Sequence, residues 1–287
     1  MPKRSEPKAS HAPADECGQR ISQHLDRLGL AGLDVEAHLT WAREHHATDR
    51  EAVERLFAQA VAIKRERSIE WRIKGSGLKV RKTLAAFDWA FQPKLDRRAV
   101  EELFSLSFLD RREDILVTGK SGTGKSHILQ ALAMKTCERE VTVRYARCVD
   151  LIDDLYAGLA DGSYQRRMRR WCRPSLLVVD DVGLGQLKRR DEEATAAHLL
   201  FTLLDRRHLN VSTALTSNIK LSAWGKYLGD ATLAAAVLDR LAATSTRLDI
   251  DGPSYRQFLA RKRAQEHGRS EERRVGKECR SRWSPYH

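Results

Sequence analysis

GKSGTGKS, from Gly119 to Ser126, is the stretch of this 287-residue chain that decides its fold. It fits the pattern G-x-x-x-x-G-K-[ST] and lies between a predicted strand, Ile115–Thr118, and a predicted helix, Ser126–Cys137. That context is the one a phosphate-binding loop requires. Its glycines allow the backbone to curl so that N–H groups point at phosphate oxygens, and the helix presents its positive end to the same anion. A glycine-rich turn with a solvated lysine is the weaker alternative.

The loop and the residue after it are predicted to bind ATP. We expect Lys125 to reach the β- and γ-phosphates and Ser126 to offer its hydroxyl to Mg²⁺. The predicted nucleotide-binding residues are Gly119, Lys120, Ser121, Gly122, Thr123, Gly124, Lys125, Ser126 and His127.

A second acidic strand follows downstream, where LLVVDD spans Leu176–Asp181. Four apolar residues predict a buried strand, and its carboxylates emerge at the carboxyl end, where ligands bind in open α/β sheets. We expect Asp180 to share Mg²⁺ with Ser126 and Asp181 to polarise an attacking water. An apolar strand that ends in two aspartates is ordinary by itself, and the phosphate loop upstream is what favours the catalytic interpretation.

Two further residues are candidates for the chemistry. Asn218 ends the predicted strand Val211–Ser217 and is placed to hold the lytic water or the γ-phosphate, although a turn former is an equal alternative. Arg240 lies near the end of a predicted helix and is a candidate arginine finger for a neighbouring subunit, with Arg247 as its rival. A surface ion pair is the alternative for either arginine.

The rest of the chain predicts an α/β fold with a parallel sheet and helices on both faces. Residues 1–18 are predicted to be disordered, 19–82 to form a small helical and basic region, and 83–264 to form the nucleotide-binding domain. Residues 265–287 are predicted to be a disordered tail, in which 269–287 resemble a translated sequencing adapter. The remaining predicted elements are the helices Leu151–Leu159, Glu192–Arg207 and Ala231–Ala242, and the strands Val141–Ala146, Leu176–Val179 and Arg247–Ile250.

The charge balance favours a polyanionic partner, with nucleic acid first. Lys and Arg total 51 against 39 Asp and Glu, a net charge of +12. Without residues 269–287, which hold six basic and three acidic residues, the charge is 12 − 3 = +9. No apolar run is long enough for a membrane span and no secretory signal is visible, so a cytoplasmic protein is expected.

Three basic clusters are candidates for contact with phosphate groups. Two tryptophans, Trp71 and Trp171, lie beside them and are expected to pack in the core or an interface rather than stack on bases. The clusters are Lys64, Arg65, Arg67, Arg72, Lys74, Lys79, Arg81 and Lys82; Arg166, Arg167, Arg169, Arg170 and Arg173; and Lys188, Arg189 and Arg190.

Several longer stretches resemble the IstB family of AAA+ ATPases, relatives of the helicase loader DnaC. The resemblance covers residues 20 to 264, and the FDWAFQP segment and the spaced TSN, GD and LDRL segments are its most specific parts. The stretches are HLDRLGLAGL (24–33), the entry segment and phosphate loop (82–128), DDVGLGQL (180–187), the segment from LTSN to LDRL (215–241) and DGPSYR (251–256).

The resemblance implies an oligomeric, ATP-dependent protein that binds duplex DNA and assists a transposase in selecting or remodelling target DNA. It also implies Asn218 as the first sensor and Arg240 as the finger. Three departures stand out. Asp181 replaces the usual Glu, the N-terminal region is more basic than is usual, and no full helical lid follows Ile250, which leaves Arg256 as the candidate second sensor.

Two other functions fit parts of the pattern. A replicative helicase loader of the DnaC type would act mainly on a protein partner and on single-stranded DNA. A small-molecule kinase with a phosphate loop would be monomeric and would need a substrate pocket under an arginine-bearing lid. The basic linker and the LDRL and DGPSYR neighbourhoods favour the transposition helper.

Overall fold

The computed structural model describes residues 14–185, 187 and 195–264, and it divides the chain into two compact units, residues 1–71 and 72–287. The tail at 265–287 and most of the segment expected to be disordered at the N-terminus lie outside the described residues. Among the described residues, no helix combines the length and the apolar character that a membrane crossing needs.

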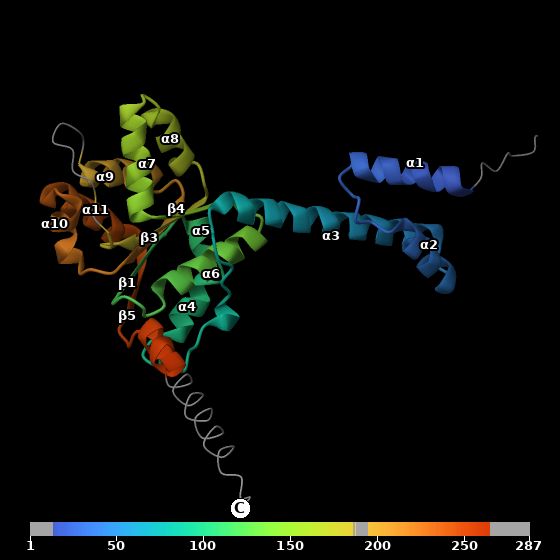
Figure 1. Ribbon diagram of the computed structural model, residues 1–287. Helices are drawn as coiled ribbons and strands as arrows, with labels where there is room; N and C mark the ends of the chain where they lie inside the picture. Colours follow the sequence, from blue (N-terminus) through green and yellow to red (C-terminus); the bar gives the residue numbers. More distant parts are fainter. Residues whose placement is uncertain (1–13, 186, 188–194, 265–287) are drawn as a thin grey trace, which may run out of the picture. The chain divides into compact units, whose positions relative to one another are not determined.

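The N-terminal unit is built from helices (Figure 1). They are α1 (Ala14–Arg27), α2 (Val35–Glu44) and most of α3 (Asp49–Ser76). Local side chains determine where α2 and α3 begin. Before α2, Asp34 accepts a hydrogen bond from Ala37 N at 2.9 Å, and before α3, Thr48 and Glu51 bond reciprocally as a capping box. Because α1 begins at Ala14, the disorder expected through residue 18 is wrong for residues 14–18.

The boundary between the units falls earlier than the sequence indicates. It lies between Trp71 and Arg72, inside α3, and not near residue 82. Gly75 does not interrupt the helix, because a glycine costs a helix only about 1 kcal/mol and the burial of Ile73 and Ser76 outweighs that. Trp71 is 72% exposed, so of the core or interface packing expected for this side chain the core alternative is wrong and the interface alternative stays a prediction.

The second unit has one five-stranded sheet in the order β2-β3-β4-β1-β5, with every neighbouring pair parallel. This confirms the predicted α/β class. It also places β4 between β3 and β1, so Asn218 follows a strand that lies between the acidic strand and the strand that enters the phosphate loop. The strands are β1 (Asp114–Gly119), β2 (Val143–Arg147), β3 (Leu176–Val182), β4 (Ser212–Ser217) and β5 (Ser245–Ile250).

Helices cover both faces of this sheet (Figure 1). Alternate strand residues point to opposite faces, so Leu116, Leu177 and Leu215 join the core beneath α7, α9 and α11, while α6 packs on the other face. The predicted helices become α6 (Lys125–Glu138), α7 (Cys148–Ala160), α9 (Ala196–Arg207) and α11 (Ala231–Thr244). The sequence reading omitted α4 (Arg97–Leu103), α5 (Ser107–Arg111), α8 (Tyr164–Cys172), α10 (Trp224–Leu228), the short helices η1 (Leu84–Ala86) and η2 (Leu221–Ala223), and a helix at residues 255–264.

A buried arginine joins α9 to the start of the sheet. The Arg207 side chain is only 1% exposed, and burial lowers the pKa of its guanidinium to about 10. It donates a hydrogen bond to Thr213 Oγ1 at 3.0 Å and others to backbone carbonyl oxygens. These carbonyls belong to Trp171, Cys172, Pro174 and Ser212, at 3.1, 2.9, 2.9 and 2.6 Å.

We predict that Arg207→Gln lowers the free energy of unfolding by about 3 kcal/mol, because several buried carbonyl groups lose their donor. Urea denaturation followed by circular dichroism measures the change. The neighbouring Arg206 is exposed, so Arg206→Gln serves as the control, with an expected change within about 0.5 kcal/mol. Equal stability of the two variants would contradict the role given to Arg207.

Candidate functional site

The phosphate loop connects β1 to α6 and depends on glycine at its bends. Gly122 and Gly124 have φ angles of +84° and +105°, in the left-handed region that other residues enter at a cost. Space is also restricted, since a Cβ on Gly124 would lie 2.8 Å from Cε2 of Phe87. A Cβ on Gly122 would collide with Ser254. The loop is therefore enclosed by residues far from it in the sequence.

Lys125 begins α6 and folds back over the loop. Its side chain is 3% exposed, and its ammonium donates hydrogen bonds to the carbonyl oxygens of Gly119 and Lys120 at 2.8 and 2.7 Å. Burial lowers the pKa of this ammonium, and the charges of Asp181 and Asp180 oppose that effect. The lysine is thus a buried cation near two carboxylates, and its positive charge suits binding of an anionic triphosphate.

Asp180 is a buried carboxylate shared by three elements. It is 1% exposed and accepts hydrogen bonds from Ser126 Oγ at 3.0 Å, from the Tyr145 hydroxyl at 2.5 Å and from Thr216 Oγ1. The two predicted metal ligands, Ser126 and Asp180, therefore lie side by side. Their oxygen donors suit a hard cation such as Mg²⁺.

Asp181 is turned toward the same site by a local irregularity of β3. The pairing register with β4 shifts between Val179 and Val182, and Asp181 itself has a left-handed φ of +62°. Its N–H donates to Thr216 Oγ1 at 2.7 Å, and its carboxylate accepts from Asn218 Nδ2 at 2.9 Å. A bulge re-aims a side chain in this way next to many active sites. Asp181 and Asn218, which the sequence indicates as separate candidates, are therefore in direct contact.

These groups line one cavity of about 400 Å³. Of the predicted nucleotide-binding residues, Gly122 to His127 line it, whereas Gly119, Lys120 and Ser121 do not. The lining also includes residues that the motif did not identify. The cavity residues outside the loop are Lys82, Ala86, Phe87, Asp88, Phe91, Gln92, Gln130, Tyr145, Asp180, Asp181, Asn218, Tyr255 and Arg256.

Tyr145 and Thr216 are the polar positioning groups that sequence reasoning missed. Tyr145 stands on β2, accepts a bond from Gln130 Nε2 at 3.0 Å and donates to Asp180. Burial raises the pKa of its phenol, and the Asp180 charge raises it further, so the hydroxyl keeps its proton. Neither residue belongs to the phosphate loop or the acidic strand, and although Thr216 begins the TSN segment, both roles arise from strand neighbours that are distant in the sequence.

The entry segment and the C-terminal segment meet at the loop. Gln92 Nε2 donates to the Pro253 carbonyl at 3.0 Å, and the Phe91 and Tyr255 rings are 5.0 Å apart. Tyr255 N donates to the Gly122 carbonyl at 2.9 Å. Two stretches that carry the family resemblance, FDWAFQP and DGPSYR, thus form one wall of the cavity.

His127 and Arg256 lie on this wall in different ways. The His127 ring nitrogen Nε2 is 2.9 Å from the Thr83 carbonyl oxygen, the ring packs edge-on against Phe87, and burial lowers its pKa. Arg256 belongs to the helix at 255–264, and its Nη2 is 3.4 Å from Ser121 Oγ. Arg256 thus reaches the cavity despite the short lid.

Neither finger candidate lines this cavity. Arg240, on α11, pairs with Asp205 at 2.7 Å and lies over the Phe201 ring at 4.4 Å. Arg247, on β5, pairs with Asp249 at 3.1 Å and lines a second cavity of about 430 Å³, next to Lys120. Within this chain neither arginine lines the cavity that Lys125 and Asp180 share, although Arg247 lies near the start of the loop.

The model of the IstB-like ATP binding protein family matches residues 23–264. The chain belongs to this family. The IstB-like protein is 34% identical to a protein of insertion sequence IS5376 from Geobacillus stearothermophilus, over 86% of its length and 97% of the relative's. It is 35% identical to a protein of IS21 from Pseudomonas aeruginosa, over 83% and 89% of the two lengths.

Solved structures support the fold of the IstB-like protein. AMPPCP-bound DnaA from Aquifex aeolicus matches with a TM-score of 0.50 at 20% identity, and a DNA replication initiation factor matches with 0.51 at 20%. The matches cover 65% and 66% of this chain and 55% and 56% of those chains. The likeness shows that this chain shares their fold, in agreement with the predicted parallel sheet flanked by helices.

We predict that Gly124→Ala weakens ATP binding by the IstB-like protein at least about tenfold, since the new Cβ meets Phe87 at a left-handed position. Titration with a fluorescent ATP analogue measures the effect. Gly162→Ala is the matched control, because Gly162 has a φ of +70° with no atom near its virtual Cβ. If both variants bind ATP like the wild type, the close packing at Gly124 is irrelevant to binding.

Proposed function

We propose that this protein hydrolyses ATP as an oligomer on duplex DNA, and that it assists a transposase in selecting target DNA for an insertion sequence. The main observation in support of this function is that one cavity is lined by Lys125, Ser126, Asp180, Asp181 and Asn218. Each group has the chemistry that nucleoside-triphosphate hydrolysis needs, and hydrogen bonds join Ser126 to Asp180 and Asn218 to Asp181.

The loop and α6 bind the triphosphate in this proposal. Backbone N–H groups of residues 119–126 and the positive end of α6 stabilise the phosphate oxygens. Lys125 turns from the carbonyls of Gly119 and Lys120 to the β- and γ-phosphates, and its charge offsets theirs. The wall of Phe87, Phe91 and Tyr255 offers apolar surface to the base.

Mg²⁺ fits the pair of Ser126 and Asp180. Among the described residues no three His, Cys, Asp or Glu side chains gather as a metal site, so the ion would depend on phosphate oxygens for further ligands. When bound, it supplies charge neutralisation to the β- and γ-phosphates. Tyr145 and Thr216 hold the Asp180 carboxylate in place for it.

Asp181 and Asn218 orient the attacking water. Asp181 is one methylene shorter than the Glu of related ATPases, and the bulge in β3 turns its carboxylate into the cavity. The amide of Asn218 donates to that carboxylate at 2.9 Å, which places an amide and a general base side by side. Arg256 enters the cavity from the C-terminal helix as the second sensor.

The genetic setting of the relatives supports the transposition role. Both relatives described above are named as ATP-binding proteins of insertion sequences, which favours a transposase over a replicative helicase as the protein partner. The net charge of +12 supports duplex DNA as the polyanion. We place the protein in the cytoplasm, where the DNA and ATP are.

The oligomer is supported by residues that one chain leaves exposed. On α3, Val53, Phe57 and Val61 are 52%, 66% and 64% exposed at a spacing of four residues, which forms an apolar stripe. We assign the helical region at 19–82 to self-association and DNA binding. Arg240 then reaches the cavity of the neighbouring subunit as its finger.

We predict that duplex DNA stimulates ATP hydrolysis by the wild type severalfold and that Lys125→Ala abolishes hydrolysis, because the main phosphate ligand is lost. Phosphate release with and without DNA measures both rates. Lys135→Ala is the control, since Lys135 is an exposed residue of the same helix. A wild type that ignores ATP would overturn the proposed function.

We predict that a mixture of Arg240→Ala and Lys125→Ala proteins regains part of the hydrolysis that each lacks. In mixed oligomers, an intact Arg240 from the Lys125 variant can serve an intact loop in the Arg240 variant. Phosphate release across mixing ratios measures the recovery, and Arg247→Ala with Lys125→Ala tests the rival finger. No recovery for the Arg240 pair would exclude Arg240 as a finger supplied between subunits.

A further inference from the structure

One of the three basic clusters can be placed wholly within one unit. Residues 188–190 lie outside the described residues, and the cluster from Lys64 to Lys82 extends across the boundary between the units. The remaining cluster lies on α8 and the residue that follows it. Because all of α8 belongs to the second unit, its two faces can be compared directly.

The arginines of α8 divide between those faces. Met168 and Trp171 are buried at 0% and 5% exposure, and Arg167 points inward with them. The outward arginines recur at i, i+3, i+4 and i+7, which is the spacing of one helix face. This outer stripe consists of Arg166, Arg169, Arg170 and Arg173, all of them exposed.

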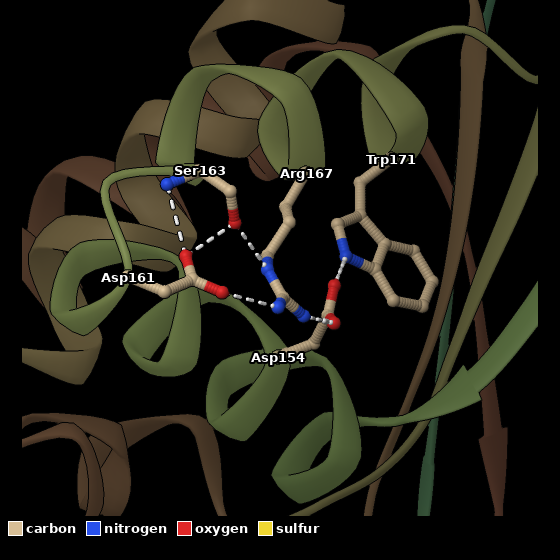
Figure 2. Close-up of polar contacts among 5 residues, drawn as sticks. All are labelled: Asp154, Asp161, Ser163, Arg167 and Trp171. Carbon is tan, nitrogen blue, oxygen red and sulfur yellow. Dashed lines mark hydrogen bonds and ion pairs between the residues drawn. The ribbon is translucent and has the colours of Figure 1, made fainter.

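The inner face uses the carboxylates that α7 and its following turn offer. Figure 2 shows Arg167 between Asp154, at 2.5 Å, and Asp161, at 2.8 Å, while Trp171 Nε1 donates to Asp154 at 2.7 Å. Hydrogen bonds from Ser163 and then Arg167 lower the pKa of Asp161 to about 2. The contact with phosphate groups expected for Arg167 is therefore wrong. Its two ion pairs instead fix the orientation of α8.

The outer stripe lacks this kind of neutralisation. In the described part of the chain, none of its arginines has a carboxylate within ion-pair distance. Two more cations border it: Arg144 lies over the Trp171 ring at 4.2 Å, and Arg206 bonds to Gln165 at 3.3 Å. Burial, and then the charge of Arg170, lower the pKa of Arg144. Like charges this close destabilise a helix, so the stripe costs stability unless a polyanion covers it.

We propose that the outer stripe of α8 binds the phosphate backbone of duplex DNA, which rests on DNA being the partner proposed above. Guanidinium groups bind phosphate through paired N–H donors. From Arg166 to Arg173 the helix rises about 10 Å, a length over which duplex DNA carries about six phosphate charges. The stripe meets the backbone without reading sequence.

The composition of this face favours duplex DNA over the other polyanions. Proteins that bind single strands present aromatic rings to the bases, and the only tryptophan of α8 is buried. A protein partner would be expected to meet an apolar anchor, and no large apolar side chain of α8 is exposed. An arginine face with no exposed tryptophan and no exposed large apolar side chain matches a phosphate backbone best.

The test is the salt dependence of DNA binding by the full chain. Fluorescence anisotropy with a labelled duplex and ATP, from about 50 to 300 mM salt, gives the slope of log K against log salt. Arg169→Gln/Arg173→Gln removes two contacts and reduces that slope by about two. The control, Arg98→Gln/Arg139→Gln, removes the same charge from exposed positions on α4 and after α6 and leaves the slope unchanged.

The outcomes separate this proposal from the function on which it rests. Unchanged binding of an ATP analogue by both double variants shows that they are folded. Equal slopes for the two double variants would overturn the role of α8 while leaving DNA binding intact. If the Arg169→Gln/Arg173→Gln variant lowers the salt slope only for single-stranded DNA, the stripe binds single strands. If this variant binds duplex DNA normally but no longer captures the transposase, the stripe binds the transposase. A wild type that binds no duplex with ATP would refute the proposed function itself.

Discussion

The site is organised around one buried carboxylate. Asp180 is 1% exposed and would be costly to bury without partners, and it is stabilised by hydroxyl groups from α6, β2 and β4. Those bonds fix the distance between the phosphate loop and the acidic strand. Thr216 Oγ1 also accepts a hydrogen bond from the N–H of Asp181, so Asp180 and Asp181 share this hydroxyl group. The strand order, which places β4 between β3 and β1, is what makes this sharing possible.

Close packing around the glycines links the ends of the domain to that carboxylate. Phe87 occupies the space that a side chain at Gly124 would need, and Ser254 does the same at Gly122. The entry segment and the C-terminal segment are further joined by the bond from Gln92 to Pro253. The cavity is therefore lined by residues of both segments, with Phe87 from the entry segment and Tyr255 from the C-terminal segment.

The arginines of this chain have three different environments, although they look alike in the sequence. Arg207 is buried among backbone carbonyls and Arg167 is paired with two aspartates, whereas the outer stripe of α8 is exposed and has no such pair among the described residues. Desolvation decides the first case and ion pairing the second. Only the third has charge left for a polyanion, so net charge alone overstates the basic surface that DNA could meet.

The sequence by itself determined the phosphate loop, the acidic strand and the alternation of strands and helices, because these depend on local spacing and hydrophobic periodicity. The structure places Lys125, Ser126, Asp180, Asp181 and Asn218 around one cavity, and the roles expected for them stay predictions. Tertiary structure alone decided the roles of Tyr145, Thr216 and Gln92, the continuation of α3 past Gly75 and the division of the α8 arginines. Each of these depends on which distant residues pack together, and burial by such neighbours outweighs local preference.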